Sequence, residues 1–181
     1  MRTVTPHDDR QGERGASIAE AMVVLALTSV VLTTTASYSI SWLGREDLRS
    51  AASEIRTQLQ ATRTHAINRN RAARFQLDTA LRRFQVYDLV DPGNNADDIL
   101  LATASLPDTV TFARPDSGST VTLPVLSGTT YQATFESNGS VSSTPGLVCL
   151  SGGARYGRVT LYAAGGVKLE RWLNSAWTNG S

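Results

Sequence analysis

Residues 15–43 begin Gly15-Ala16-Ser17-Ile18-Ala19-Glu20 and continue as AMVVLALTSVVLTTTASYSISWL, which ends at Leu43 and contains no charged residue. At about 1.5 Å per residue, this run of 23 residues is long enough as a helix to span a hydrocarbon core of about 30 Å. A secretory signal peptide has a shorter apolar region of about 7–15 residues. The run therefore predicts a helix that can cross a membrane, with one carboxylate at its head.

The helix is expected to continue beyond the apolar run. After Leu43, apolar residues recur at helical spacing and arginines fall between them, as in an amphipathic helix. The apolar residues are Leu48, Ala52, Ile55, Leu59 and Ala66, and the arginines are Arg45, Arg49, Arg56 and Arg63. No proline occurs between Ala16 and Val90. We predict one helix over about residues 16–68, apolar over 16–43 and amphipathic in the part of the chain from 44 to 70.

The rest of the chain, residues 71–181, changes to the alternation of apolar and polar residues that is typical of strands. A hairpin is expected over residues 73–77 and 82–87. Further short strands are expected over residues 99–104, 110–112, 121–126, 131–135, 147–150, 158–162 and 167–172. The sequence thus predicts an α+β protein in which a long N-terminal helix precedes one small domain of antiparallel β-sheets.

The carboxylate of Glu20 requires an explanation, because an acid in an apolar setting costs several kcal/mol unless it finds a partner. The segment around it resembles the class III signal segment of type IV pilins and type II secretion pseudopilins. That segment has a short polar leader, a glycine, a cleavage point, and a glutamate five residues into the mature chain. Gly15 matches the residue before the cut, Ala16 the mature N-terminus and Glu20 the glutamate. The alternative is an ordinary signal anchor.

This resemblance implies a path for the chain. A prepilin peptidase removes residues 1–15 on the cytoplasmic side, and Ala16 becomes the N-methylated terminus. The apolar helix stays in the inner membrane as a single span, with the C-terminal domain in the periplasm. In the filament, the Glu20 carboxylate neutralises the α-amino group of a neighbouring subunit and fixes the axial register.

A second resemblance lies in the C-terminal half. The stretch Thr134-Phe135-Glu136-Ser137-Asn138-Gly139-Ser140-Val141 resembles a turn of the GspH/FimT family of minor pseudopilins and minor pilins, and residues 157–161 and 165–169 resemble its closing hairpin. The likeness implies a pilin-like fold, in which a spine helix packs on antiparallel sheets. It also implies a minor subunit that primes or caps a type IV pilus or a type II secretion pseudopilus.

DNA capture is the alternative function that the resemblance raises. Some members of the FimT branch bind DNA through a basic C-terminal motif, and the matching region here offers Arg155, Arg158, Lys168 and Arg171 as contacts. Phosphate neutralisation requires several clustered cations, and Glu170 reduces the charge of this region.

Enzymatic chemistry is poorly supported by the residue types. His65 is the only histidine beyond the leader and Cys149 the only cysteine, so neither a histidine-based triad nor a His/Cys zinc cluster can be assembled. We expect no catalytic residues, no cofactor and no metal, and we expect Cys149 to be a buried thiol. The acidic loop over residues 91–98 offers oxygen donors for calcium, but it lacks EF-hand spacing.

Charge is unevenly distributed along the chain, although the formal net charge is only +1. Residues 45–83 carry nine arginines against four acidic residues, whereas residues 84–181 carry five basic and eight acidic residues. This asymmetry suits heterologous contacts between stacked subunits. A solvated helix face accounts for it equally well.

Overall fold

The computed structural model describes the backbone of residues 18–91 and 95–179, with the side chains of these residues except those of 32–43 and 95. The predicted leader, Gly15 and Ala16 lie outside the described residues. The chain divides into two compact units, residues 1–40 and 41–181, and each is described by itself. One helix, α1 (Ile18–Arg69), belongs to both units and ends one residue after the predicted end.

In the first unit, the described part of α1 presents apolar side chains to solvent. Residues 18–31 are all exposed, and they include Ile18, Met22, Leu25 and Val31. In the part of the chain that the structure describes, no helix is long and apolar enough to cross a membrane. The side chains of residues 32–43, which complete the predicted span, lie outside the described residues.

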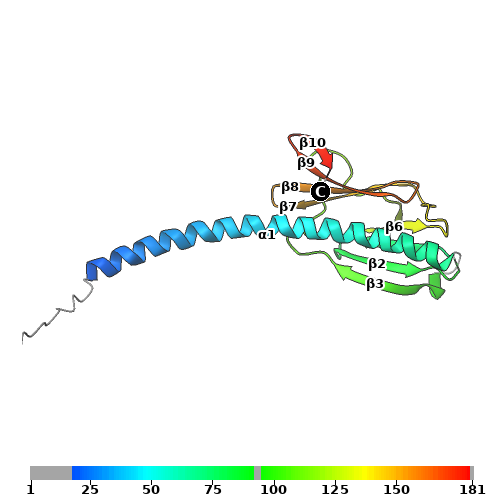
Figure 1. Cartoon of the computed structure of the whole chain (residues 1–181), viewed down its shortest axis with the longest axis horizontal. Helices are drawn as coiled ribbons and strands as arrows, with labels where there is room; N and C mark the ends of the chain where they lie inside the picture. The colour runs from blue at the N-terminus through cyan, green and yellow to red at the C-terminus, as the bar shows by residue number, and fades with distance from the viewer. Residues whose placement is uncertain (1–17, 92–94, 180–181) are drawn as a thin grey trace, which may run out of the picture. The chain divides into compact units, whose positions relative to one another are not determined.

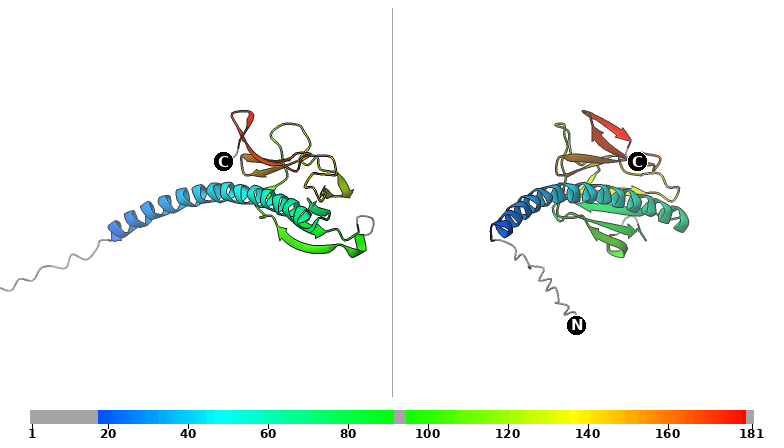
Figure 2. Two further views of the ribbon diagram at one scale, coloured as in Figure 1. Left: turned by 45° about the vertical axis from the view of Figure 1, so that its right-hand side comes forward. Right: turned by 60° about the vertical axis from the view of Figure 1, so that its left-hand side comes forward.

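In the second unit, one face of α1 packs against two five-stranded antiparallel sheets, and Figures 1 and 2 show β2 and β3 of one sheet on one side of the helix and β7 to β10 of the other sheet on the other side. The first sheet has the order β3-β2-β1-β6-β5 and the second the order β10-β9-β8-β7-β4. The strands are β1 (Ala73–Asp78), β2 (Arg83–Asp88), β3 (Ile99–Ser105), β4 (Val110–Thr111), β5 (Val125–Ser127), β6 (Thr130–Phe135), β7 (Leu147–Gly152), β8 (Arg155–Leu161), β9 (Val167–Leu173) and β10 (Ala176–Asn179). The predicted pilin-like α+β fold is confirmed.

The core lies between the helix and the inner faces of both sheets. Its fully buried side chains include Ile55 and Leu59 of α1, Phe75 and Phe84 of the first sheet, and Val159 of the second. The rings of Phe75 and Phe84 stack with centroids 5.7 Å apart. The apolar stripe that the sequence places on one side of the helix is therefore the surface that joins the two sheets.

The predicted hairpin is confirmed. β1 and β2 pair antiparallel from Ala73 with Asp88 to Asp78 with Arg83. A carboxylate oxygen of Asp78 closes the turn, because it accepts hydrogen bonds from the backbone N–H groups of Ala80 at 2.9 Å and Leu81 at 3.0 Å. The hydrogen bond from Leu81 is the main cause that lowers the pKa of Asp78.

Two strand predictions differ from the structure. The predicted strand over 121–126 is wrong in its first part, because only β5 forms there and Val121 makes a single bridge to Val148. Pro124 has no N–H to donate, which interrupts the ladder. The second difference is β10, which was not predicted and pairs with β9 through a two-residue turn. Asn174 and Ser175 both have positive φ in that turn, as a type I′ hairpin requires.

Two glycines of the second sheet face the helix. A Cβ atom on Gly152 would overlap the carbonyl oxygen of Gly44 and would lie 2.8 Å from Cβ of Leu48. A Cβ on Gly157, which also faces the helix, would lie 3.7 Å from a methyl carbon of Leu48, an ordinary contact. Gly152 thus sets how closely the backbone of α1 lies against β7.

We predict that Gly152→Ala lowers the free energy of unfolding by about 1–3 kcal/mol, because the added methyl group must displace helix backbone. Gly157→Ala is the matched control and should change it by less than about 1 kcal/mol. Denaturant unfolding of the full chain in detergent, followed by circular dichroism, measures both variants. Equal stability of the two variants would contradict the assigned close approach.

Candidate functional site

Glu20, the predicted assembly residue, lies in the first turn of α1 and is exposed. Its carboxylate makes no ion pair with any residue in the described part of the chain. A carboxylate near a helix N-terminus is favoured by the helix dipole, by about 0.3–1 kcal/mol on an exposed surface. The geometry leaves this acid available to a partner from outside the chain.

The four cations proposed for DNA contact fall on two faces of the second sheet. Arg158 pairs with Glu170 and Thr160 with Lys168, so Arg158 and Lys168 share the outer face. Gly157, which faces α1, pairs with Arg171, so Arg171 belongs to the helix side. By the same alternation Arg155 also belongs to the helix side, at the exposed end of β8. The structure does not bring the four together.

On the outer face, Arg158 and Lys168 are held by one buried carboxylate. Arg158 donates to Oε2 of Glu170 through Nε at 2.8 Å and lies 2.6 Å from it through Nη2. Nζ of Lys168 lies 2.9 Å from Oε1, and the Thr160 hydroxyl donates to Oε2 at 3.2 Å. Only 8% of the Glu170 side chain is exposed. The carboxylate therefore has a donor on both oxygens.

The pKa values reflect this arrangement. Burial would raise the pKa of Glu170, but the hydrogen bonds from Lys168 and Arg158 outweigh burial and hold that pKa below its ordinary value. The hydrogen bond to Glu170 in turn raises the pKa of Lys168. Glu170 is thus ionised at neutral pH and compensates part of the positive charge that DNA capture would need.

Two tryptophans complete the outer face, and the sequence analysis did not include them. The guanidinium of Arg158 lies 4.4 Å from the ring centroid of Trp177 on β10, a cation–π arrangement. Trp177 meets Trp172 of β9 edge to face, with centroids 5.2 Å apart. The signal that could have revealed β10 was the Asn174-Ser175 pair between two segments that each carry a tryptophan.

The predicted turn after β6 is attached to α1. The side-chain oxygen of Asn138 accepts a hydrogen bond from the backbone N–H of Ser140 at 2.8 Å, and Gly139 has a φ of 78°. Nε of Arg63 donates to the carbonyl of Gly139 at 3.0 Å. A Cβ atom on Gly165, in the β8–β9 turn, would overlap that carbonyl. Turns from both sheets therefore meet at one arginine of the helix.

The expected buried thiol is confirmed. Cys149 is free and fully buried on β7, and burial raises its pKa to about 11. The thiol is thus protonated at neutral pH and a poor nucleophile.

The acidic loop places its last carboxylate in an ion pair. Asp98 pairs with Nη2 of Arg74, and both side chains are nearly buried. Arg74 also lies over the ring of Tyr87, 5.5 Å from its centroid. Within the described residues, no group of three or more His, Cys, Asp or Glu side chains could hold a metal ion.

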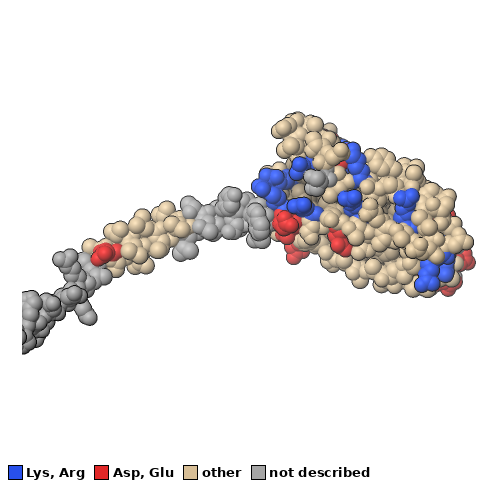
Figure 3. Space-filling view, viewed as in Figure 1, with Lys and Arg blue, Asp and Glu red and all other residues tan. Residues whose placement is uncertain are grey.

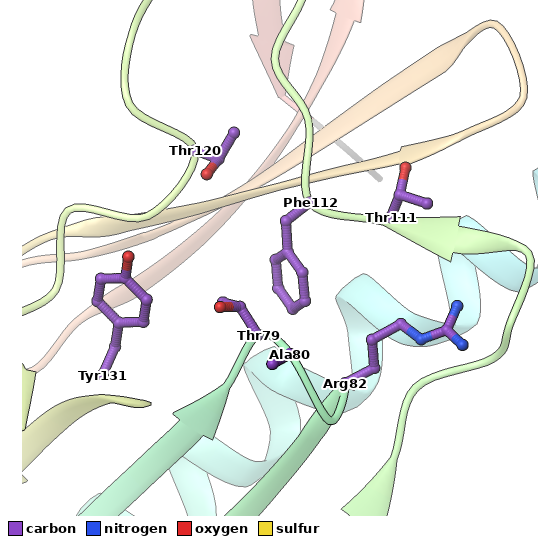
Figure 4. Close-up of a pocket in the computed structure, with 7 residues that line it drawn as sticks. All are labelled: Thr79, Ala80, Arg82, Thr111, Phe112, Thr120 and Tyr131. Carbon is purple, nitrogen blue, oxygen red and sulfur yellow. The ribbon is translucent and has the colours of Figure 1, made fainter. Parts of the chain in front are cut away.

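One hollow of about 350 Å³ opens between the sheets, and Figure 4 shows the Phe112 ring in its middle. Thr79, Ala80, Arg82, Thr111, Thr120 and Tyr131 line it around this ring. Arg82 already donates to Asp108, to the carbonyl at 2.8 Å and to the carboxylate at 2.7 Å. Hydroxyls and two aromatic rings remain in the lining, and these residues supply no carboxylate or imidazole to act as a general base.

Comparisons with known proteins agree with this architecture. The family model of the type II transport protein GspH matches residues 51–165, more than half of the chain, and the chain belongs to this family. The turn at Asn138 lies within the matched region, which ends before β9.

Two solved structures show the shared fold. The minor pseudopilin EpsH from the type 2 secretion system of Vibrio cholerae matches with a TM-score of 0.51 and 15% identity, over 68% of this chain and 95% of that chain. The type IV minor pilin FimU of Pseudomonas aeruginosa matches with a TM-score of 0.53 and 19% identity, over 74% and 94%. No curated protein sequence matches the chain.

We predict that Glu170→Gln lowers the free energy of unfolding by about 1–3 kcal/mol at pH 7, because hydrogen bonds to a charged acceptor are lost. The pKa of Glu170 in the folded protein lies below the ordinary value of 4.5. Its contribution to the free energy of unfolding is therefore complete above about pH 5 and is lost as the pH falls through the folded pKa. Denaturant titrations of the wild type and of Glu170→Gln between pH 7 and pH 3 should show that the difference in their free energies of unfolding becomes smaller as the pH falls. The exposed Glu46→Gln serves as the control, and a difference that is independent of pH would contradict the assignment.

Proposed function

We propose that this chain is a minor pseudopilin or minor pilin, a subunit that assembles into a type II secretion pseudopilus or a type IV pilus and primes or caps the filament. Membership of the GspH family is the observation that carries this proposal. It is supported by the continuity of α1, because one helix holds the globular domain and also bears exposed apolar side chains over residues 18–31.

An exposed apolar helix surface must be covered by something outside the chain. In the proposed function, the lipid of the inner membrane covers it first, with the N-terminus in the cytoplasm and the domain in the periplasm. In the filament, the helices of neighbouring subunits cover it instead. Both environments accept the uncharged run from Ala21 to Leu43, and both penalise an unpaired carboxylate at its head.

Glu20 is proposed as the residue that sets the register between subunits. The prepilin peptidase would create a new α-amino group at Ala16, and a neighbouring subunit's α-amino group would be the partner of the Glu20 carboxylate. A buried, unpaired charge costs several kcal/mol, so axial positions that separate the two groups are disfavoured.

Processing after Gly15 predicts a definite mass. Intact mass spectrometry of the protein purified from its host should show the loss of residues 1–15 and one added methyl group on Ala16. The Gly15→Leu variant should keep its full-length mass, because it no longer has a small residue before the cleavage point and should not be cleaved. Full-length, unmethylated wild-type protein from cells with an active prepilin peptidase would contradict the proposed processing.

Glu20→Leu is predicted to reduce the amount of the chain in sheared filaments at least tenfold, because the neighbour's α-amino charge loses its partner. Thr28→Val is the matched control, since the Thr28 hydroxyl donates only to carbonyls of its own helix, including that of Val24 at 2.9 Å. The control should assemble normally. Immunoblotting of filament and membrane fractions measures both variants, and unimpaired assembly of Glu20→Leu would refute the register role.

A further inference from the structure

Four exposed arginines lie at one end of the globular unit: Arg45 and Arg49 on α1, Arg155 on β8 and Arg171 on β9. We call them the basal basic cluster. Figure 3 shows Lys and Arg side chains gathered at the end of the domain where its part of α1 begins. Among the described residues, no carboxylate lies close enough to form an ion pair with any of the four.

The close approach of helix and sheet brings these residues together from distant parts of the sequence. Gly152 and Gly153 lie beside Gly44, which places Arg155 level with the start of this part of the helix. Arg171 pairs with Gly157, whose neighbours across the interface are Leu48 and Ala52. Arg45 and Arg49 are four residues apart and therefore share one side of α1.

Acidic residues nearby do not cancel the cluster. Glu46 and Asp47 are its close carboxylates on the helix, and Asp47 accepts a hydrogen bond from the Thr109 hydroxyl at 2.6 Å. Glu46 and Glu54 line a shallow hollow together with Arg49, Ser50 and Ser53. Four positive charges stand against the three carboxylates of Glu46, Asp47 and Glu54, so this end of the domain keeps a small positive charge.

The position of the cluster along the chain indicates what it meets. Arg45 and Arg49 follow Leu43, the last residue of the uncharged run, by about 3 and 9 Å along the helix axis. The headgroup layer on each side of a bilayer is about 5–7 Å thick, and the Debye length at physiological salt is about 8 Å. Arg56, on the same side of the helix, lies about 20 Å beyond Leu43, outside both distances.

We propose that the basal basic cluster binds the headgroups of anionic phospholipids at the membrane surface, and so holds the subunit in the membrane before it enters a filament. The proposal rests on the membrane anchor of the proposed function. Each arginine near an anionic surface contributes a favourable interaction, and an exposed cluster suits a surface of many headgroups better than one enclosed anion.

The test uses the full chain in nanodiscs of phosphatidylcholine with one fifth phosphatidylglycerol. Native mass spectrometry after release from the disc counts the lipids that remain bound. The wild type should retain phosphatidylglycerol at least fivefold over its share of the disc. The combined variant Arg45→Gln, Arg49→Gln, Arg155→Gln and Arg171→Gln should lose this preference, and Arg56→Gln, the matched control, should keep it.

Circular dichroism of the combined variant checks that it folds, and the single variants Arg45→Gln and Arg155→Gln should each weaken the preference about twofold or more. A wild-type chain that enters nanodiscs without preferring phosphatidylglycerol would overturn this inference and leave the anchor intact. A preference that depends equally on Arg56 would also overturn it. A chain that does not enter nanodiscs would overturn the anchor and the inference together.

Discussion

The packing of one face of α1 against two sheets is the interaction on which the rest of the second unit depends. Ile55, Leu59 and Ala66 are almost completely buried there, and Gly152 allows the helix backbone to touch β7. Arg63 ties turns of both sheets to the same helix. The buried hydrophobic core of the described residues therefore includes side chains of the helix as well as of both sheets. In the proposed function, the subunit moves from a membrane into a filament, and a force applied along the helix would act directly on this interface.

Two carboxylates show how the fold distributes charge between internal and external partners. Glu170 is buried, and Arg158, Lys168 and Thr160 donate to it, so its charge is satisfied within the domain. Glu20 is exposed at the head of an apolar helix and pairs with no described residue of its own chain. In the proposed function, its partner is the terminus of another subunit. Leaving a carboxylate unpaired is costly. At Glu170 the domain itself supplies the donors that avoid this cost, and in the proposed function assembly with another subunit avoids it at Glu20.

Local patterns predicted the elements well, whereas the grouping of side chains depended on the fold. The helical spacing of apolar residues sufficed for the helix, and the alternation of apolar and polar residues sufficed for the first hairpin, since both patterns are local in the sequence. The split of the DNA candidates over two faces depends on the register of β8 against β9, which short strands do not reveal. The basal basic cluster depends on the contact of Gly152 with α1 across about a hundred residues of chain. The missed β10 shows that a turn with two positive φ angles can form from Asn-Ser, without the glycine that usually marks it.

The most direct test of the account is to ask what covers the exposed apolar half of α1 in the cell. A photo-crosslinking amino acid at Val24, an exposed position on this half, can be activated in cells that assemble the filament. We predict crosslinks to other pilin-type subunits in the sheared filament fraction. Crosslinks to lipid alone, with no trace of the chain in filaments, would contradict it.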